Sequence, residues 1–142
     1  MTEDFEGLAR SWWEGTRLAS GTQDERKRWS LGEPSDVEAG YETARERIDQ
    51  GDEGSVELVM ALLRSAPDDF GVVLVGAGPL EDLVVWHGDD LALQIEKLAR
   101  QCPLFHQALS SVWIGSRTLA PEAEVRLAPW IPALRADRDR RS

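Results

Sequence analysis

The sequence predicts an all-α fold, either a compact bundle of about six or seven short helices or a stack of helix pairs. Three observations predict it. Apolar residues recur at helical spacing in successive segments, glycine and proline separate these segments at short intervals, and capping residues precede several of them. Apolar residues make up 42% of the 142 positions, which is enough for a core. We expect one helical domain over residues 1–134 and a charged, disordered tail over residues 135–142.

The first half of the chain begins with two expected helices joined by a charged segment. The first helix runs from Glu3 to Leu18, and its apolar face consists of Phe5, Leu8, Ala9 and Trp12. Residues 24–29 fit either a helical turn or a loop. The second helix begins at Ser35 or Asp36 and ends at Gly51. Its apolar stripe consists of Val37, Tyr41, Ala44 and Ile48.

A third helix is expected from Val56 to Ser65, with Ser55 as its N-cap and Pro67 beyond its end. The apolar run that follows, residues 71–76, is ambiguous. Its valines favour a strand, whereas a short apolar run is equally typical of a buried helix.

Several more helices are expected in the second half. Pro79 fits the first position of a helix from Leu80 to His87, which Gly88 would end. Asp89 or Asp90 can begin the next helix, whose apolar stripe consists of Leu91, Ile95, Leu98, Ala99 and Cys102. Beyond Pro103 the helical spacing continues through Phe105, Leu109, Val112 and Trp113. A weaker helix is expected from Pro121 to Ala128.

The charge of the chain is negative and unevenly distributed. The formal net charge is −10, and residues 31–90 carry 15 acidic and three basic side chains. This balance argues against a nucleic-acid binder, which needs a basic face, whereas a concentrated negative field can steer a basic partner. One cysteine, an acidic start and an apolar run of only residues 70–80 predict a cytoplasmic protein without a membrane segment.

The segment from Val72 to Pro79 is similar to the strand and glycine turn of a dinucleotide site. Such a site requires a third glycine, but Glu81 occupies that position and Asp82 follows it. Two carboxylates at this point would repel a pyrophosphate. We therefore interpret the segment as a tight turn between two helices and expect no cofactor.

The same segment carries a family resemblance. It reads Gly76-Ala77-Gly78-Pro79-Leu80-Glu81-Asp82-Leu83, followed by His87-Gly88, Ile95-Glu96, Ala99-Arg100, Pro103, Phe105, Ala108-Leu109 and Val112-Trp113. In this order it resembles a bacterial family of small helical proteins of unknown function, over about residues 70–113. The resemblance implies an all-helical fold and so favours a helix for residues 70–75. It implies no activity and no catalytic residues.

Two groups of side chains are candidates for a catalytic or metal-binding site. Glu81, Asp82 and His87 could form an acid–base group, but adjacent helical residues point about 100° apart, so helical spacing alone does not bring the three together. We expect Glu81 or Asp82 to cap backbone N–H groups and His87 to favour a helix C-terminus. Cys102 and His106 are four residues apart, yet Pro103 intervenes and the cysteine lies on an apolar stripe. We expect no nucleophile and no metal site here.

The function that we expect is protein binding. Six tryptophans are available; we interpret Trp113 as part of the core, and Trp29 and Trp130 as surface anchors. An acidic helical surface would bind a basic protein partner, as an immunity-type inhibitor does. Its predicted residues are Trp29, Glu33, Asp36, Glu38, Glu42, Glu81, Asp82, Trp86 and His87. The alternatives are an enzyme built on Glu81, Asp82 and His87, and a homodimeric structural or regulatory module.

Overall fold

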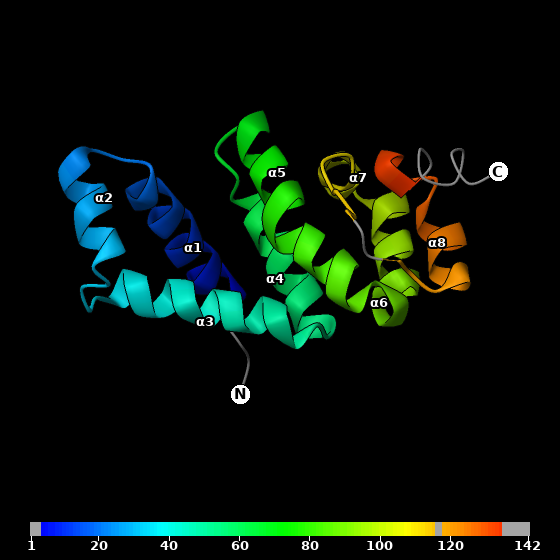
Figure 1. Cartoon of the computed structure of the whole chain (residues 1–142), viewed down its shortest axis with the longest axis horizontal. Helices are drawn as coiled ribbons and strands as arrows, with labels where there is room; N and C mark the ends of the chain where they lie inside the picture. Colours follow the sequence, from blue (N-terminus) through cyan, green and yellow to red (C-terminus); the bar gives the residue numbers. More distant parts are fainter. Residues whose placement is uncertain (1–3, 116–117, 135–142) are drawn as a thin grey trace.

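The computed structural model describes residues 4–115 and 118–134, and within these ranges the chain is helical and contains no strand. Eight α-helices and one π-helical segment follow one another (Figure 1). They are α1 (Phe5–Ala19), α2 (Gln23–Ser30), α3 (Asp36–Gln50), α4 (Glu53–Arg64), α5 (Asp69–Val75), η1 (Gly76–Leu80), α6 (Glu81–Gln101), α7 (Pro103–Leu109) and α8 (Pro121–Leu127). The all-α prediction is confirmed, and the predicted tail lies outside the described residues.

The first three helices begin at side-chain caps. The Asp4 side chain accepts from the backbone N–H of Gly7 at the start of α1, and Ser35 caps α3 in the same way. The charged segment that fitted a turn or a loop is α2, because Thr22 and Glu25 form a capping box at its start. Gly51 ends α3 as predicted, with φ of 63° in the left-handed region.

The predicted start of α4 is wrong by three residues. Asp52 is the N-cap, and its carboxylate accepts from the backbone N–H of Ser55 at 3.1 Å. The Ser55 side chain completes the capping box from the first turn of the helix, and its hydroxyl also donates to the backbone carbonyl of Arg47. Ser55 is therefore buried, and its hydroxyl joins the start of α4 to the end of α3.

Residues 69–101 form one continuous helical run, so the predicted turn at Gly76–Pro79 is wrong (Figure 1). The run widens into a π-helical segment where Pro79 lies inside it. Proline lacks the N–H of a regular helical turn and its ring crowds the preceding carbonyl, and a π bulge accommodates both. The ambiguous run 71–76 is helical, as the family resemblance implied.

Gly88 and Asp89 do not lie at a helix boundary either. Gly88 is buried in the middle of α6, where a Cβ atom would lie 3.1 Å from the Leu119 side chain. The Asp89 carboxylate accepts from the backbone N–H of Ala120 at 2.7 Å, so it holds the start of α8 against α6. A continuous α6 explains both contacts.

The helical run from Asp69 to Gln101 has 33 residues and is long and apolar enough, by length and composition, to cross a membrane. Within its most apolar window, 44% of the residues are buried inside the structure. The core helix of a soluble protein has the same composition, so this feature does not distinguish the two cases.

The last two helices agree with their predicted starts. Pro103 and Pro121 occupy the first positions of α7 and α8. However, α7 ends at Leu109, and Trp113, predicted to be a core residue, is 63% exposed. The helical spacing that suggested a buried Trp113 fails because the chain has already left the helix.

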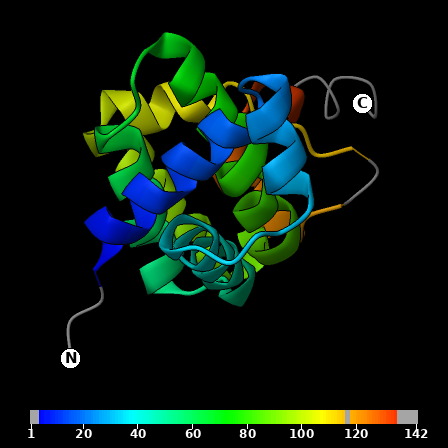
Figure 2. The ribbon, with the colours of Figure 1, turned by 90° about the vertical axis from the view of Figure 1, so that its left-hand side faces the viewer.

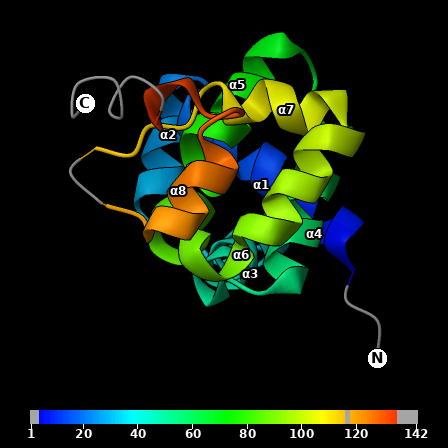
Figure 3. The ribbon, with the colours of Figure 1, turned by 90° about the vertical axis from the view of Figure 1, so that its right-hand side faces the viewer.

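Helices α1, α2 and α3 lie at one end of the molecule, and α7, α8 and the second half of α6 lie at the other (Figure 1). The view from the first end shows α1 and α2 in front (Figure 2), and the opposite view shows α6, α7 and α8 (Figure 3). Helix α1 packs on α3 and α4, and α6 packs on α7 and α8. Helix α4 connects the two ends, because it contacts α1, α3, α5, α6 and α7.

Candidate functional site

A groove lies between α3 and the beginning of α6. Its first part is a cavity of about 390 Å³ that Trp12, Tyr41, Arg45, Ile48, Asp49, Gly78, Pro79 and Asp82 line. The second part is a cavity of about 310 Å³ that Ile48, Asp49, Asp82, Trp86 and His87 line. The two cavities share Ile48, Asp49 and Asp82, so we treat them as one site, the α3–α6 groove.

Helical spacing places three residues on each wall of the α3–α6 groove. Tyr41, Arg45 and Asp49 follow one another at intervals of four along α3. Residues 78, 82 and 86 repeat this interval on the opposite wall, from the π-helical segment into α6. Residues four apart lie on the same face of a helix, so each wall is a continuous stripe.

Gly78 lines the groove at a position where a side chain would have space. A Cβ atom at this position would meet nothing within 4 Å. Gly76, two residues earlier, has the opposite surroundings, since a Cβ atom there would overlap the backbone carbonyl of Ala108. The close approach of α7 therefore requires glycine at position 76, whereas the packing at position 78 does not.

The electrostatics of the groove centre on Asp82. Partial burial raises the pKa of the Asp82 carboxyl, the nearby Asp49 carboxylate raises it further, and the Arg45 guanidinium acts in the opposite direction. Asp82 as a whole is nevertheless exposed to solvent, which limits the size of this effect. Two carboxylates thus share a cavity in which one arginine offsets their repulsion only in part. A second cation in the groove would favour the charged form of Asp82.

His87 joins α6 to the end of α3. Its Nε2 atom lies 2.9 Å from the backbone carbonyl oxygen of Asp49. The imidazole also lies against Gly51, where a Cβ atom would overlap the ring. His87 was expected to favour a helix C-terminus, and the terminus that it contacts belongs to α3.

Glu81 lies apart from the other two members of the proposed acid–base group. Its carboxylate accepts from the backbone N–H of Trp113 at 2.7 Å, which fits the expected capping of a backbone N–H group. Asp82 and His87 both line the α3–α6 groove. The groove therefore contains one carboxylate and the imidazole of the predicted three, together with Asp49.

Of the six other predicted binding residues, Trp86 lines the groove and the remaining five do not. Trp86 is 61% exposed. Glu33, Asp36 and Glu42 are exposed, and Glu38 is half-buried, on α3 and the loop before it. Trp29, predicted to be a surface anchor, is half-buried and packs edge-on against Tyr41 with ring centroids 5.0 Å apart. Trp29 therefore contacts a residue that lines the groove.

Sequence reasoning missed Tyr41, Arg45 and Asp49 as site residues. Their regular interval on α3 is visible in the sequence, and Tyr41 was assigned only to the inward stripe. Whether these three side chains line a groove depends on the packing of α3 against α6. That contact joins segments about 40 residues apart in the sequence. Periodicity within one helix does not contain this information.

Within residues 4–115 and 118–134, no group of three or more His, Cys, Asp or Glu side chains is arranged to hold a metal ion. The His106 ring packs edge-on against Trp130, with ring centroids 5.1 Å apart. Trp130 is half-buried there, in contrast to the surface anchor that was expected.

Comparison with known proteins identifies a family but not an activity. No curated protein and no solved structure matches the chain. A family model described as a family of unknown function, DUF6869, matches residues 20–129. This range contains both walls of the α3–α6 groove and most of the chain, and the chain therefore belongs to the DUF6869 family of unknown function.

Proposed function

We propose that this chain is a protein-binding module whose α3–α6 groove receives a basic side chain of a protein partner. The observation that carries the proposal is the pairing of Asp49 and Asp82 in one cavity, where the pKa of Asp82 is raised by burial and by Asp49. A cation between the two carboxylates would offset their repulsion. It would also favour the charged form of Asp82. The net charge of −12 over residues 31–90 supports a positive partner.

An arginine side chain suits this groove better than a compact cation. Its planar guanidinium can donate to two carboxylates at once, and it stacks on aromatic rings. Asp49 and Asp82 supply the acceptors, while Tyr41 and Trp86 supply rings on opposite walls. A protruding arginine of the partner would therefore combine ion pairing with a cation–π contact.

Acidic residues of α3 and of the loop before it would extend this surface. Glu33, Asp36, Glu38 and Glu42 would meet basic residues around the protruding arginine and raise the rate of association. A module of this kind can block the active site of a basic enzyme, and we assign the chain to immunity-type inhibitors on that basis. We also propose that the chain is bacterial and cytoplasmic. The sequence pattern from Gly76 to Gly88 would then identify relatives that share the groove.

The test begins with capture of partners on the immobilised chain from a lysate of the source cell. A candidate partner supports the proposal only if it is basic, dissociates as salt is raised, and binds the purified chain in calorimetry. The Asp49→Asn/Asp82→Asn double variant should weaken that binding by about tenfold or more, because it removes two charge-assisted contacts.

A charge-matched control separates the groove from net charge. The Glu57→Gln/Asp90→Asn double variant removes the same charge at exposed positions outside the groove. It should change the affinity by less than about threefold. Equal effects of the two double variants, or a partner that binds regardless of salt, would contradict the proposal.

A homodimeric module is a second candidate, and the exposed indole of Trp113 favours it. Large exposed aromatic side chains are enriched at interfaces between proteins. Light scattering over a range of concentrations tests it. A dimer that Trp113→Ser dissociates would support this candidate, and a monomer at all concentrations would rule it out. An enzyme that uses Asp82 and His87 would instead lose an activity on alanine substitution while it keeps its helicity.

A further inference from the structure

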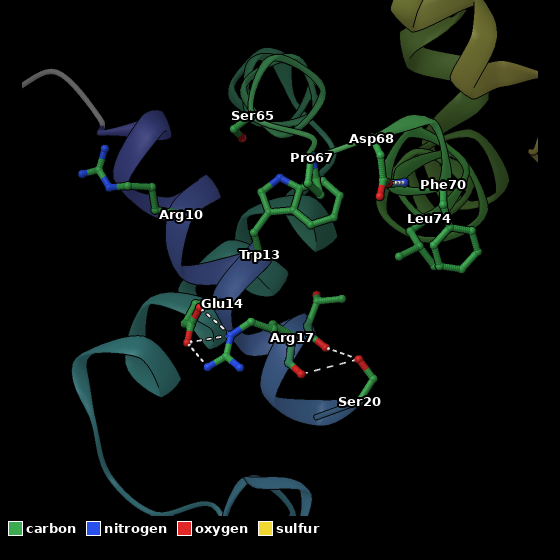
Figure 4. Close-up of a pocket in the computed structure, with 12 residues that line it drawn as sticks. Arg10, Trp13, Glu14, Arg17, Ser20, Ser65, Pro67, Asp68, Phe70 and Leu74 are labelled. Carbon is green, nitrogen blue, oxygen red and sulfur yellow. Dashed lines mark hydrogen bonds and ion pairs between the residues drawn. The ribbon is translucent and has the colours of Figure 1, made fainter. Parts of the chain in front are cut away.

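A second cavity lies between α1 and α5, next to the turn that joins α4 to α5 (Figure 4). It has a volume of about 680 Å³ and shares no lining residue with the α3–α6 groove. Its apolar wall consists of Trp13 from α1, Pro67 from the turn, and Phe70 and Leu74 from α5. A concave site of this volume with an apolar, aromatic wall is typical of sites for small organic molecules.

Contacts within the chain fix the apolar wall of this cavity. The indole N–H of Trp13 donates to the backbone carbonyl of Leu62 at 3.1 Å, so the ring is held in one orientation. Gly71 lets α5 approach this ring, since a Cβ atom there would lie 2.9 Å from Pro67 and 3.0 Å from Trp13. The wall is therefore formed without a ligand, as is usual for sites of small molecules.

The two arginines that line the cavity do not offer it a free positive charge. The Arg17 guanidinium is paired with the Glu14 carboxylate at 2.6 Å and with the Glu25 carboxylate at 3.0 Å. The Arg10 guanidinium is directed away from the cavity (Figure 4). An anionic ligand would therefore find no partner here.

The Asp68 carboxylate is the lining charge that can accept a partner. Its Oδ1 atom accepts from the backbone N–H of Gly71 at 2.8 Å, and in the described part of the chain the carboxylate has no ion pair and no second hydrogen bond. Figure 4 shows Asp68 between Trp13 and Phe70. The start of a helix carries only about half a positive charge. The Asp68 carboxylate exceeds it, and the exposed Asp69 adds to the excess, so this end of the cavity attracts a cation.

We propose that this cavity binds a small aromatic amine, a molecule in which a planar ring carries one ammonium group. The ring packs against Trp13, Phe70 and Leu74. The ammonium pairs with the Asp68 carboxylate and gains a cation–π contact with the neighbouring indole. An uncharged ring would use the apolar wall alone, and a compact cation would use the carboxylate alone. The site is independent of the proposed protein-binding groove.

Calorimetry with tryptamine tests the proposal on the full chain. We expect saturable binding of one molecule per chain, with a change in the NMR signal of the Trp13 indole N–H. Tryptophol, which has a hydroxyl in place of the ammonium, should bind about threefold to fivefold less tightly, as expected when an exposed ion pair is lost. Indoleacetate, which has the opposite charge, should bind least.

Two pairs of matched variants separate the carboxylate from the apolar wall. Asp68→Asn removes the charge but keeps a good helix cap. It should weaken tryptamine binding by about threefold to fivefold and leave tryptophol binding unchanged, whereas Asp69→Asn, outside the lining, should change tryptamine binding by less than about twofold. Phe70→Ser should weaken the binding of both probes by about tenfold, because an apolar contact is lost. Leu93→Ser removes a side chain that is 66% exposed, close to the 67% of Phe70, and should have no effect.

A further variant excludes binding of tryptamine in the α3–α6 groove, which is also acidic. The Asp49→Asn/Asp82→Asn variant leaves the cavity between α1 and α5 intact and should bind tryptamine as the wild type does. The variant is also the one that should lose the protein partner. Failure of the amine proposal and failure of the protein-binding proposal are therefore distinguishable.

Four results would overturn the proposal. They are no binding of tryptamine, equal binding of tryptamine and tryptophol, binding that leaves the Trp13 indole signal unchanged, and binding that Asp68→Asn does not weaken. Loss of tryptamine binding in the Asp49→Asn/Asp82→Asn variant would assign the amine to the α3–α6 groove and would also overturn it.

Discussion

The Nε2 atom of His87 lies 2.9 Å from the backbone carbonyl oxygen of Asp49, so the middle of α6 is held against the end of α3. Last-turn carbonyls have no partner within their own helix, and this contact satisfies one of them. His87 also lines the α3–α6 groove, together with Asp49 and Trp86. The groove is thus part of the packing between two helices.

Replacement of His87 by alanine tests this contact. We expect the free energy of unfolding to fall by about 1 kcal/mol, the usual contribution of one hydrogen bond. Urea unfolding followed by circular dichroism measures it. Gln107→Ala, on the exposed side of α7, should change the free energy by less than about 0.5 kcal/mol. A His87→Ala variant as stable as the control would show that the contact does not stabilise the fold.

Gly51 and His87 should be coupled in a double-mutant cycle. Gly51→Ala places a Cβ atom on the imidazole and puts alanine in the left-handed region, so we expect a loss of about 2 kcal/mol or more. In the His87→Ala background the overlap disappears, and only the backbone cost of about 1 kcal/mol remains. Equal losses in both backgrounds would mean that the imidazole does not lie against Gly51.

Gly76 and Gly78 form a matched pair for the π-helical segment. Gly76→Ala should destabilise the chain by more than about 2 kcal/mol, because its Cβ overlaps the Ala108 carbonyl. Gly78→Ala should be neutral or stabilising by up to about 1 kcal/mol, since alanine favours helices and nothing lies within 4 Å. Thermal unfolding of both variants measures the difference. The reverse order of stabilities would contradict the continuous helix.

The charge of Asp82 should lower the stability of the folded chain. Because the folded-state pKa is raised, the folded form holds its proton to higher pH than the unfolded form does. Stability is therefore lost as pH rises through this range and is regained below the ordinary pKa of aspartate. Asp82→Asn should gain at most about 0.5 kcal/mol at neutral pH, since the group is partly solvated, and nothing near pH 3. Urea unfolding at both pH values measures this, and a gain confined to low pH would contradict it.

Helices with a strong internal pattern were predictable from the sequence. The stripes of α1 and α3 and the proline starts of α7 and α8 depend on neighbouring residues alone, and all four agree with the structure. The errors arose where a residue type is typical of more than one structural position. Pro79 and Gly88 are typical of helix boundaries, but the π bulge accommodates the proline, and close packing on Leu119 accounts for the glycine. Asp52 precedes Ser55 and is the N-cap instead.

The candidate site was predictable on one wall only. Asp82, Trp86 and His87 were selected from their residue types, whereas Arg45 and Asp49 became site residues through the packing of α3 on α6. Glu81 shows the same dependence, because its partner Trp113 lies 32 positions along the chain. Contacts of this range require the tertiary structure.

The most direct test of the α3–α6 groove is an NMR titration of the Asp82 carboxyl with and without acetylarginine amide. The pKa of Asp82 should fall when the probe is present, and the indole N–H signal of Trp86 should shift. Acetylcitrulline amide, which has nearly the same shape without the charge, should do neither. If the pKa of Asp82 stays the same with both probes, or falls equally with both, the groove is not a site for a basic side chain.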